Sequence, residues 1–486
     1  MKRISYTIFL LAIVCTSMVS CKKFLEKEPF GKTGKNTLFE TVTGAKQGIT
    51  GSYNRMLDYY KNEFGMYGDV ASDNVIRNTS STSTVMVQQF NYQSSVSDDA
   101  FAVGHIWLDI YETLNNVNNV LNAVPELKTK FPDQTKTLDS ITGQGLVMRA
   151  ICHFDLSRVY AQSYKYTGDA SHLGVPVLLK TPSPGEQVPR KTMRETYDQI
   201  ILDLTNALPL LQQHANHTTQ ASISYQAALA LLSRVNLYKG DWAQSINYAN
   251  LMISDTRYQL ASSTSYKSSF ITYLNNNAAV KVENIFQLTN AGLPNGSANV
   301  FSVYSDAATA QYTASSKLKG AFDADDIRLT QMFNVPTTGI NLGRSVTTKY
   351  ADGVLSTVNP PAVQVIRLSE VYLNRAEAKW NLQQYTAAAE DLRIISQRAH
   401  PDRTITIIYN SPEDLYKQIT DERNRELCFE GHRLFDLARR KENMTRGADC
   451  NATVCQVTFP NDKFVLPIPQ KEIEANRALI PNPGFN

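Results

Sequence analysis

The densest group of ionisable side chains lies between residues 421 and 440, where acids and arginines recur at helical spacing. Carboxylate pairs can act as general acid and base, as they do in glycosidases. The same spacing also suits salt bridges, because residues three or four positions apart share one face of a helix. Three such pairs are Glu422 with Arg425, Glu430 with Arg433 and Asp436 with Arg440. Each acid has an arginine within reach, so we favour a salt-bridge network, either solvated or between helices.

Cysteines and histidines offer a second kind of chemistry. Cys450 and Cys455 flank a short loop in a Gly/Asn/Thr-rich segment, which makes them candidates for a local disulfide outside the cytoplasm. Cys152 and Cys428 lie in apolar helical patterns and are interpreted as buried thiols. The seven histidines are scattered, with no ligand spacing beside these cysteines, so the sequence predicts no metal site.

The usual motifs of catalysis and cofactor binding are missing from the sequence. There is no His-Glu-x-x-His, no Gly-x-Ser-x-Gly and no phosphate-binding glycine loop. We therefore expect no cofactor and no enzymatic activity. The net charge of the 486 residues is only +3, which argues against a nucleic-acid-binding protein. Charged residues are 19%, and Tyr (24) outnumbers Trp (3), a composition that suits a polar, uncharged surface and neutral ligands.

The N-terminus predicts export and a lipid anchor. Two basic residues precede an apolar run over residues 8–14, which is too short to span a bilayer. The run leads to Ser20-Cys21, and a small residue just before a cysteine resembles a bacterial lipoprotein box. We expect lipidation of Cys21, because several acyl chains give a firm anchor. The alternative is a plain secretory signal with an incidental cysteine.

Helical pairs position the rest of the chain. Residues 365–399 carry apolar side chains at three- and four-residue steps on both sides of a short polar turn, and residues 228–253 repeat this plan around Gly240-Asp241. Large residues near the turn and alanines on the second helix are typical of tetratricopeptide-type repeats. An apolar-x-x-Arg-small signature recurs at Arg149, Arg234 and Arg375. An ordinary helical domain with alanine-rich packing remains the alternative.

Further helices are expected at residues 43–60, 105–124, 138–160, 192–211 and 413–441, with Thr192 and Glu195 in capping-box spacing. The intervening segments at 78–99, 262–314 and 323–353 are irregular and rich in Ser, Asn, Thr and Tyr. Binding residues concentrate on loops that a rigid scaffold holds in place. We therefore expect the ligand surface on these segments.

Short motifs along the chain resemble the SusD/RagB family of outer-membrane nutrient-binding lipoproteins. The matching pieces are the lipoprotein box at Cys21, Ser72-Asp73-Asn74, residues 107–121, Met148-Arg149-Ala150 through Phe154-Asp155-Leu156, Gly174-Val175-Pro176, residues 367–378 and 422–440, Leu466-Pro467-Ile468-Pro469 and Asn482-Pro483-Gly484-Phe485. They occur in the family's order and cover nearly the whole mature chain. Each motif alone is weakly specific, whereas the ordered set is highly specific.

The resemblance implies a mainly α fold, in which tetratricopeptide-like helix pairs form a right-handed solenoid scaffold and long irregular loops with a few short strands carry the ligand face. It also implies an outer-membrane, lipid-anchored, surface-exposed protein that caps a SusC-like TonB-dependent β-barrel transporter. The protein would capture a carbohydrate or other polymeric nutrient and pass it to the barrel. The expected organisation is a signal peptide (1–20), a lipidated tether (21–35), an N-terminal helical region (36–215), a central helix pair (216–260), a loop-rich ligand-face insertion (261–364) and a C-terminal region with the last pair (365–486).

The ligand residues themselves do not follow from the resemblance, because the family's binding loops differ between members. Sugars stack on aromatic rings and bond to polar side chains through their hydroxyls. The three tryptophans lie on predicted helix faces and look structural, so tyrosines are the expected platform. The candidates are Tyr92, Tyr266, Tyr273, Tyr304 and Tyr312, with Arg77, Asn78, Asn91 and Asn299 as polar partners. Two other functions remain open: a repeat-based envelope scaffold without a nutrient ligand, and a polysaccharide-degrading enzyme.

Overall fold

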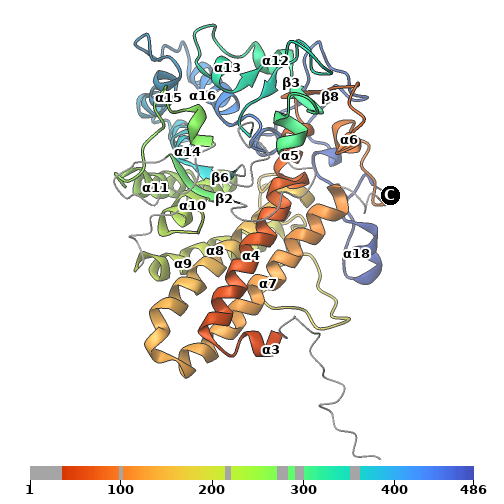
Figure 1. Ribbon diagram of the computed structural model, residues 1–486, viewed down its shortest axis with the longest axis vertical. Coiled ribbons are helices and arrows are strands. Elements are labelled where there is room, and N and C mark those ends of the chain that lie inside the picture. The colour runs from red at the N-terminus through yellow and green to blue at the C-terminus, as the bar shows by residue number, and fades with distance from the viewer. Residues whose placement is uncertain are drawn as a thin grey trace, which may run out of the picture.

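A computed structural model describes residues 35–97, 102–213, 220–270, 283–289, 300–350 and 362–485 (Figure 1). The predicted signal peptide, Cys21, most of the tether, Tyr273 and Asn299 lie outside the described residues. The described chain is mainly helical, as the sequence predicts. Its helices are α3 (Lys35–Leu38), α4 (Val42–Lys61), α5 (Glu63–Val70), α6 (Val87–Phe90), α7 (Ala102–Lys130), α8 (Thr135–Tyr160), α9 (Met193–Gln212), α10 (Tyr225–Lys239), α11 (Trp242–Ile253), α12 (Ser316–Lys319), α13 (Arg328–Gln331), α14 (Leu368–Asn381), α15 (Tyr385–Ala399), α16 (Pro412–Leu427), α17 (Arg433–Arg440) and α18 (Gln470–Ala475).

The strands are short and form antiparallel two-stranded ladders. They are β1 (Val75–Arg77) with β3 (Tyr312–Ala314), β2 (Asn284–Leu288) with β6 (Val363–Arg367), β4 (Phe333–Asn334) with β5 (Val346–Thr347), and β7 (Met444–Thr445) with β8 (Gln456–Val457). The β1–β3 and β2–β6 ladders join a strand of the loop-rich insertion to other segments of the chain, whereas β4 and β5 both lie within the insertion. Within the described residues, no helix is long and apolar enough to cross a bilayer.

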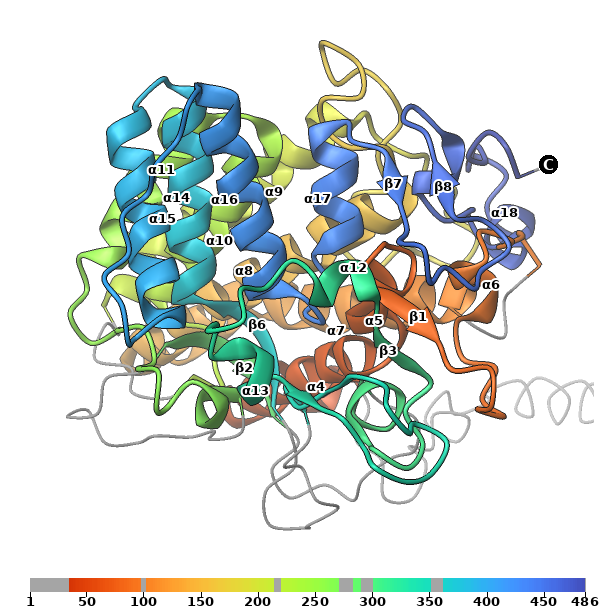
Figure 2. The same cartoon turned by 90° about the horizontal axis from the view of Figure 1, so that it is seen from above.

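The long helices pack as a continuous array. Each helix packs on the next one in the order α4, α7, α8, α9, α10, α11, α14 and α15. Helix α16 packs on both α14 and α15 (Figure 2). The two predicted helix pairs are present as α10 with α11 and α14 with α15. Gly240, at φ 82°, ends α10 in the left-handed conformation that glycine adopts readily, and Asp241 caps α11 through the backbone N–H of Gln244. The predicted capping box of Thr192 and Glu195 begins α9.

The recurring arginine proves to be a contact between helices. Arg149 on α8 donates to both carboxylate oxygens of Asp203 on α9, each at 2.8 Å. Arg375 on α14 makes the same fork with Asp391 on α15, at 2.9 and 2.6 Å. Such bidentate, charge-assisted bonds fix the separation and rotation of the two helices in a pair. The third arginine, Arg234, departs from this plan and links α10 to Glu370 on α14.

Two helix predictions need correction, one at the start of the helix and one in its interior. The first three residues of the predicted helix at 365–399 belong to strand β6, which pairs with β2, and α14 begins only at Leu368. The predicted helix over 413–441 is broken between α16 and α17, where Phe429 (φ 63°) and Gly431 (φ 75°) adopt left-handed backbone conformations. Their N–H groups donate to the buried carboxylate of Asp69, at 3.1 and 2.6 Å. A tertiary partner therefore replaces the helical hydrogen bonds.

Candidate ligand-binding face

The β1–β3 ladder brings together two of the segments that the sequence singled out. Arg77 on β1 lies opposite Tyr312 on β3, and the next residue, Asn78, donates its backbone N–H to the Gln311 carbonyl at 2.7 Å. Helix α6 lies beside them, since the rings of Phe90 and Tyr312 are 5.5 Å apart. The loop after β1 and the segment before β3 therefore form one surface (Figure 2).

A third segment, the connection between β4 and β5, is pinned to this surface by two buried asparagines. The Asn78 side chain donates to the Asn341 side-chain oxygen at 2.9 Å. Asn341 in turn donates to the carbonyls of Ala307 and Ala310, at 3.1 and 3.2 Å. A buried amide must satisfy its donors and acceptors, so this chain of bonds fixes three loops relative to one another.

The fourth segment is the loop between Cys450 and Cys455, which the structure joins by a disulfide. Asn451 bonds to both backbone groups of Arg77, accepting from its N–H at 3.2 Å and donating to its carbonyl at 2.6 Å. The Thr453 N–H donates to the Asn91 side chain at 2.8 Å. We call residues 76–93, 302–311, 334–344 and 449–456 together the polar loop face.

Uncharged polar side chains dominate the exposed part of this face. They are Thr79, Ser80, Thr82, Thr84, Gln88, Gln93, Thr309, Asn334, Thr337, Thr338, Asn451, Thr453 and Gln456. Hydroxyl and amide groups can both donate and accept hydrogen bonds, as the hydroxyls of a neutral polyol require. Apolar exposed side chains also occur at the tip of the β4–β5 connection, at Val335, Ile340 and Leu342.

The predicted residues divide into an accessible group and a buried group. Arg77, Asn91 and Tyr92 are partly exposed. Asn78, Tyr266, Tyr304 and Tyr312 are fully buried and so cannot present themselves to a ligand in this structure. The buried tyrosines each satisfy their hydroxyl internally: Tyr266 on the Met332 sulfur (3.2 Å), Tyr304 on the Met66 carbonyl (3.0 Å) and Tyr312 on the Val85 carbonyl (2.8 Å). They support the loops from below, where a ring fills the interior and its hydroxyl finds a partner.

Tyr92 is the accessible aromatic candidate among the four predicted tyrosines that the structure describes. Its backbone is left-handed, at φ 57°, and its hydroxyl donates to the Ala71 carbonyl. Burial of this hydroxyl raises the pKa of Tyr92 above its ordinary value. The ring lines a small pocket together with Lys463 and Phe485 near the C-terminus. Sequence reasoning missed Asn341, Asn451 and Thr453, because no local pattern marks a residue whose role is to bond a distant loop.

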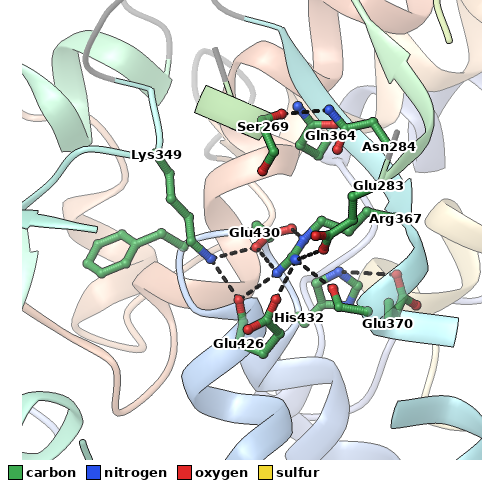
Figure 3. A network of polar contacts seen from close by, with 12 residues as sticks. Ser269, Glu283, Asn284, Lys349, Gln364, Arg367, Glu370, Glu426, Glu430 and His432 are labelled. Atoms are coloured by element: carbon green, nitrogen blue, oxygen red, sulfur yellow. Dashed lines mark hydrogen bonds and ion pairs between the residues drawn. The ribbon is translucent and has the colours of Figure 1, made fainter. Parts of the chain in front are cut away.

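A buried network of charges holds the loop-rich insertion on the helical scaffold (Figure 3). Its centre is the carboxylate of Glu426 on α16, which accepts from Arg367, Arg398 and Arg328, the last at 2.9 Å. Burial raises the pKa of Glu426, but these guanidinium groups outweigh burial and hold it well below its usual range. All four side chains are buried.

The partners of this network come from distant parts of the chain. Arg328 and Lys349 belong to the insertion: Arg328 bonds Glu422 at 2.8 Å, and the Lys349 ammonium donates to the Glu426 and Cys428 carbonyls, each at 2.8 Å. Glu283, beside β2, accepts from Arg367 at 2.6 Å. Because each charge is costly to bury unless it is paired, these contacts specify where the insertion docks.

The pairings expected from helical spacing are correct in one case and wrong in two. Glu422 bonds Arg425 as predicted, at 2.6 Å. Glu430 instead binds Lys349 and Arg367. Arg433, the predicted partner of Glu430, binds Asp73. Asp436 binds Arg423 and Arg439 instead of Arg440. Arg440 binds Glu377. The helix break between α16 and α17 turns these side chains toward other elements, and the network is buried rather than solvated. Ionised acids locked between arginines act as counterions rather than as proton donors.

Comparison with known proteins gives consistent matches to one family. A family model described as "Starch-binding associating with outer membrane" matches residues 23–237, and one described as "SusD family" matches residues 264–485. SusD-like protein P2 of Formosa agariphila is 24% identical over 536 aligned residues that span 100% of both chains. A solved SusD superfamily protein from Bacteroides thetaiotaomicron is 26% identical, with a TM-score of 0.81 over 91% of this chain and 100% of that one. A putative sugar-binding protein from Bacteroides vulgatus shares the fold, with a TM-score of 0.81, 24% identity, and coverage of 92% of this chain and 99% of that one.

Replacing Glu426 with Gln tests the role of the charge network. The variant leaves three buried arginines short of a negative charge, so we expect the free energy of unfolding to fall by about 3–5 kcal/mol. Chemical denaturation measures this change. Glu413→Gln, at an exposed position on the same helix, is the matched control and should change stability by less than about 0.5 kcal/mol. Equal effects of the two substitutions would contradict the proposed role of the network.

The pH dependence of stability should be flat near neutrality and steep in acid. Arginines outweigh burial and lower the pKa of Glu370 and Glu422 to about 2, so their contribution is present above about pH 4.5 and is lost as the pH falls toward 2. At pH 4–6.5 two effects oppose each other. Burial lowers the pKa of His432 to about 3, so the folded state loses stability at this residue as the pH falls. Burial raises the pKa of Asp69 to about 6, so the folded state gains stability at this residue as the pH falls. Denaturation midpoints from pH 7.5 to 3 measure the profile. A steep loss already complete at pH 5 would contradict it.

Proposed function

The chain belongs to the SusD family, and from this premise we propose that it is a lipid-anchored protein of the outer-membrane surface that binds a polymeric nutrient. We propose that this nutrient is a glycan and that the protein caps a SusC-like TonB-dependent transporter and passes the nutrient to it. The observation that carries this proposal is that two models of the same family match successive halves of the chain, one of them described as starch-binding. The polar loop face gives the proposal its chemistry.

Three properties of the polar loop face favour a neutral, hydroxyl-rich ligand. Its exposed side chains are mainly hydroxyls and amides, which can bond sugar hydroxyls in either direction. Its loops are held by buried asparagines and by the Cys450–Cys455 loop, so little ordering entropy remains to be lost on binding. Arg77, Asn91 and Tyr92 supply a cation, an amide and a partly exposed ring within this face. We propose these three residues as ligand contacts.

The anchor and the transporter partner follow from the same family premise. Cys21 follows a short apolar run and a small residue, so we propose that it carries the lipid. A lipid-anchored binding protein that feeds a barrel must lie at the barrel's outer mouth. Val335, Ile340 and Leu342 are exposed apolar side chains of the polar loop face, and a contact with ligand or transporter would bury them.

Co-purification of the full-length, tagged protein from its native envelope in mild detergent tests the transporter partnership. We expect a large β-barrel protein in stoichiometric amount in the eluate. The matched control is a Cys21→Ser variant, which cannot be lipidated and should no longer fractionate with the outer membrane. Recovery of the wild-type protein alone, or with periplasmic proteins only, would favour the envelope-scaffold function instead.

Substitution of the proposed contacts tests the ligand face. The probes are soluble starch and a panel of other neutral polysaccharides, and the measurement is affinity electrophoresis followed by calorimetry. We expect the Arg77→Ala/Asn91→Ala/Tyr92→Ala variant to bind at least about tenfold more weakly, which corresponds to about 1.4 kcal/mol. Gln212→Ala, at an exposed amide on α9, should bind like the wild type. Unchanged affinity of the triple variant, with an unchanged thermal midpoint, would exclude these residues as contacts.

A further inference from the structure

Three side chains with metal-binding atoms meet at the junction between the insertion and the helical scaffold. Asp323 and Asp325 lie in the loop between α12 and α13, and His400 follows the last residue of α15. The His400 Nε2 atom is 3.4 Å from a carboxylate oxygen of Asp323 and 3.7 Å from one of Asp325. One ligand atom from each of the three residues lies within 4.8 Å of the others.

The orientation of His400 is set by a second contact. Its Nδ1 atom lies 2.8 Å from the Ser396 carbonyl, so Nδ1 must carry the proton that makes this bond. In the neutral ring, Nε2 is then a bare lone pair. A histidine that ligates a metal typically donates its other ring N–H to a carbonyl or carboxylate in this way. The bond to the Ser396 carbonyl therefore orients the His400 ring as such a bond orients a metal-binding histidine.

The Nε2 atom also lacks a conventional partner. His400 is 6% exposed, and among the described residues Nε2 has no hydrogen-bond partner. An orphaned buried polar atom costs free energy, so its position needs an explanation. The two carboxylates beside it are 65% and 52% exposed, which leaves an ion access from solvent. The buried nitrogen thus points at two solvent-facing oxygen ligands.

The distances fit a metal better than a hydrogen bond. Metal bonds of about 2.0–2.1 Å to nitrogen or oxygen in a tetrahedral site place neighbouring ligand atoms about 3.4 Å apart. The two nitrogen–oxygen separations are close to this value, whereas hydrogen bonds are shorter. Imidazole as a ligand favours Zn²⁺ and its neighbours over Ca²⁺ or Mg²⁺, which prefer oxygen alone.

Arg403 holds the two carboxylates together. Its guanidinium contacts Asp323 at 3.0 Å and Asp325 at 2.6 Å. It keeps two like charges side by side, and it also competes with any other cation for the same oxygens. Arg403 thus preorganises the site. A metal ion must either displace its guanidinium group from the carboxylate oxygens or share those oxygens with it.

We propose that Asp323, Asp325 and His400 bind a divalent transition-metal ion such as Zn²⁺, with water completing its coordination. The ion joins the insertion to the end of α15, beside the backbone bond from the Ile327 N–H to the Ala399 carbonyl at 3.0 Å. The neighbouring Asp326 belongs to the buried charge network through Arg328. Metal binding therefore stabilises the docking of the insertion. This role is independent of the proposed nutrient-binding function.

Calorimetric titration of the chelator-treated, full-length protein without a histidine tag with Zn²⁺ tests the proposal. We expect one saturable site per chain and a higher thermal midpoint with Zn²⁺ than with chelator, because an ion that binds only the folded state stabilises it. Co²⁺ at the same site should give the visible absorption of a low-symmetry, nitrogen- and oxygen-ligated ion. Ca²⁺ should not compete at equal concentration.

Three variants distinguish this site from adventitious binding. Asp323→Asn/Asp325→Asn, which changes exposed side chains only, should weaken Zn²⁺ binding at least tenfold, and His400→Gln should do the same. Arg403→Gln should tighten binding, because it removes the competing cation. His105→Gln, at an exposed histidine near Glu63, is the control and should bind like the wild type. Absence of saturable binding, binding unaffected by the double variant, or weaker binding by Arg403→Gln would overturn the proposal.

Discussion

The carboxylate of Glu426, buried between three guanidinium groups, joins the loop-rich insertion, the end of β6 and α15 to α16. A charge removed from water must be neutralised by partners in nearly fixed geometry, since each unpaired ion in the interior costs several kcal/mol. The partners of Glu426 come from α13, the end of β6 and α15. Satisfying this one carboxylate therefore aligns the insertion, the last helix pair and α16 at the same time.

The helical array forms a rigid scaffold, and the loops carry the proposed binding surface. Arg149–Asp203 and Arg375–Asp391 fix neighbouring helices with bidentate bonds, and the apolar faces pack between them. The loops bury aromatic side chains such as Tyr304 and Tyr312 beneath them and are joined to one another by polar bonds such as Asn78–Asn341 and Asn451–Arg77. A face built in this way can be rigid and still expose mainly uncharged polar groups. This combination is consistent with the proposed binding of a neutral polymer.

The Asp323–Asp325–His400 cluster lies at the rim of the same junction that Glu426 controls from within. Asp326 and Arg328 belong to the buried network and follow the exposed Asp325 by one and three residues, and Arg398 of the same network precedes His400 by two residues. The buried network and the Asp323–Asp325–His400 cluster are thus adjacent in sequence both in the insertion and at the end of α15. The network is closed to solvent, whereas the two carboxylates of the cluster are exposed.

The sequence alone determined what depends on near neighbours in the chain. Helical periodicity predicted the α10–α11 and α14–α15 pairs, and residue spacing predicted the capping box at Thr192 and the candidate Cys450–Cys455 disulfide, because side chains within one or two turns of a helix or loop set these features. The resemblance to the family came from short motifs that occur in a fixed order along the whole chain. Contacts between distant segments, which no local pattern reveals, make residues 365–367 part of a strand, break the helix after α16 through Asp69, and bury Tyr266, Tyr304 and Tyr312. Only the tertiary structure chose the partner of each charge and placed His400 beside carboxylates far away in sequence, because partners from distant segments are selected by packing and desolvation rather than by local spacing.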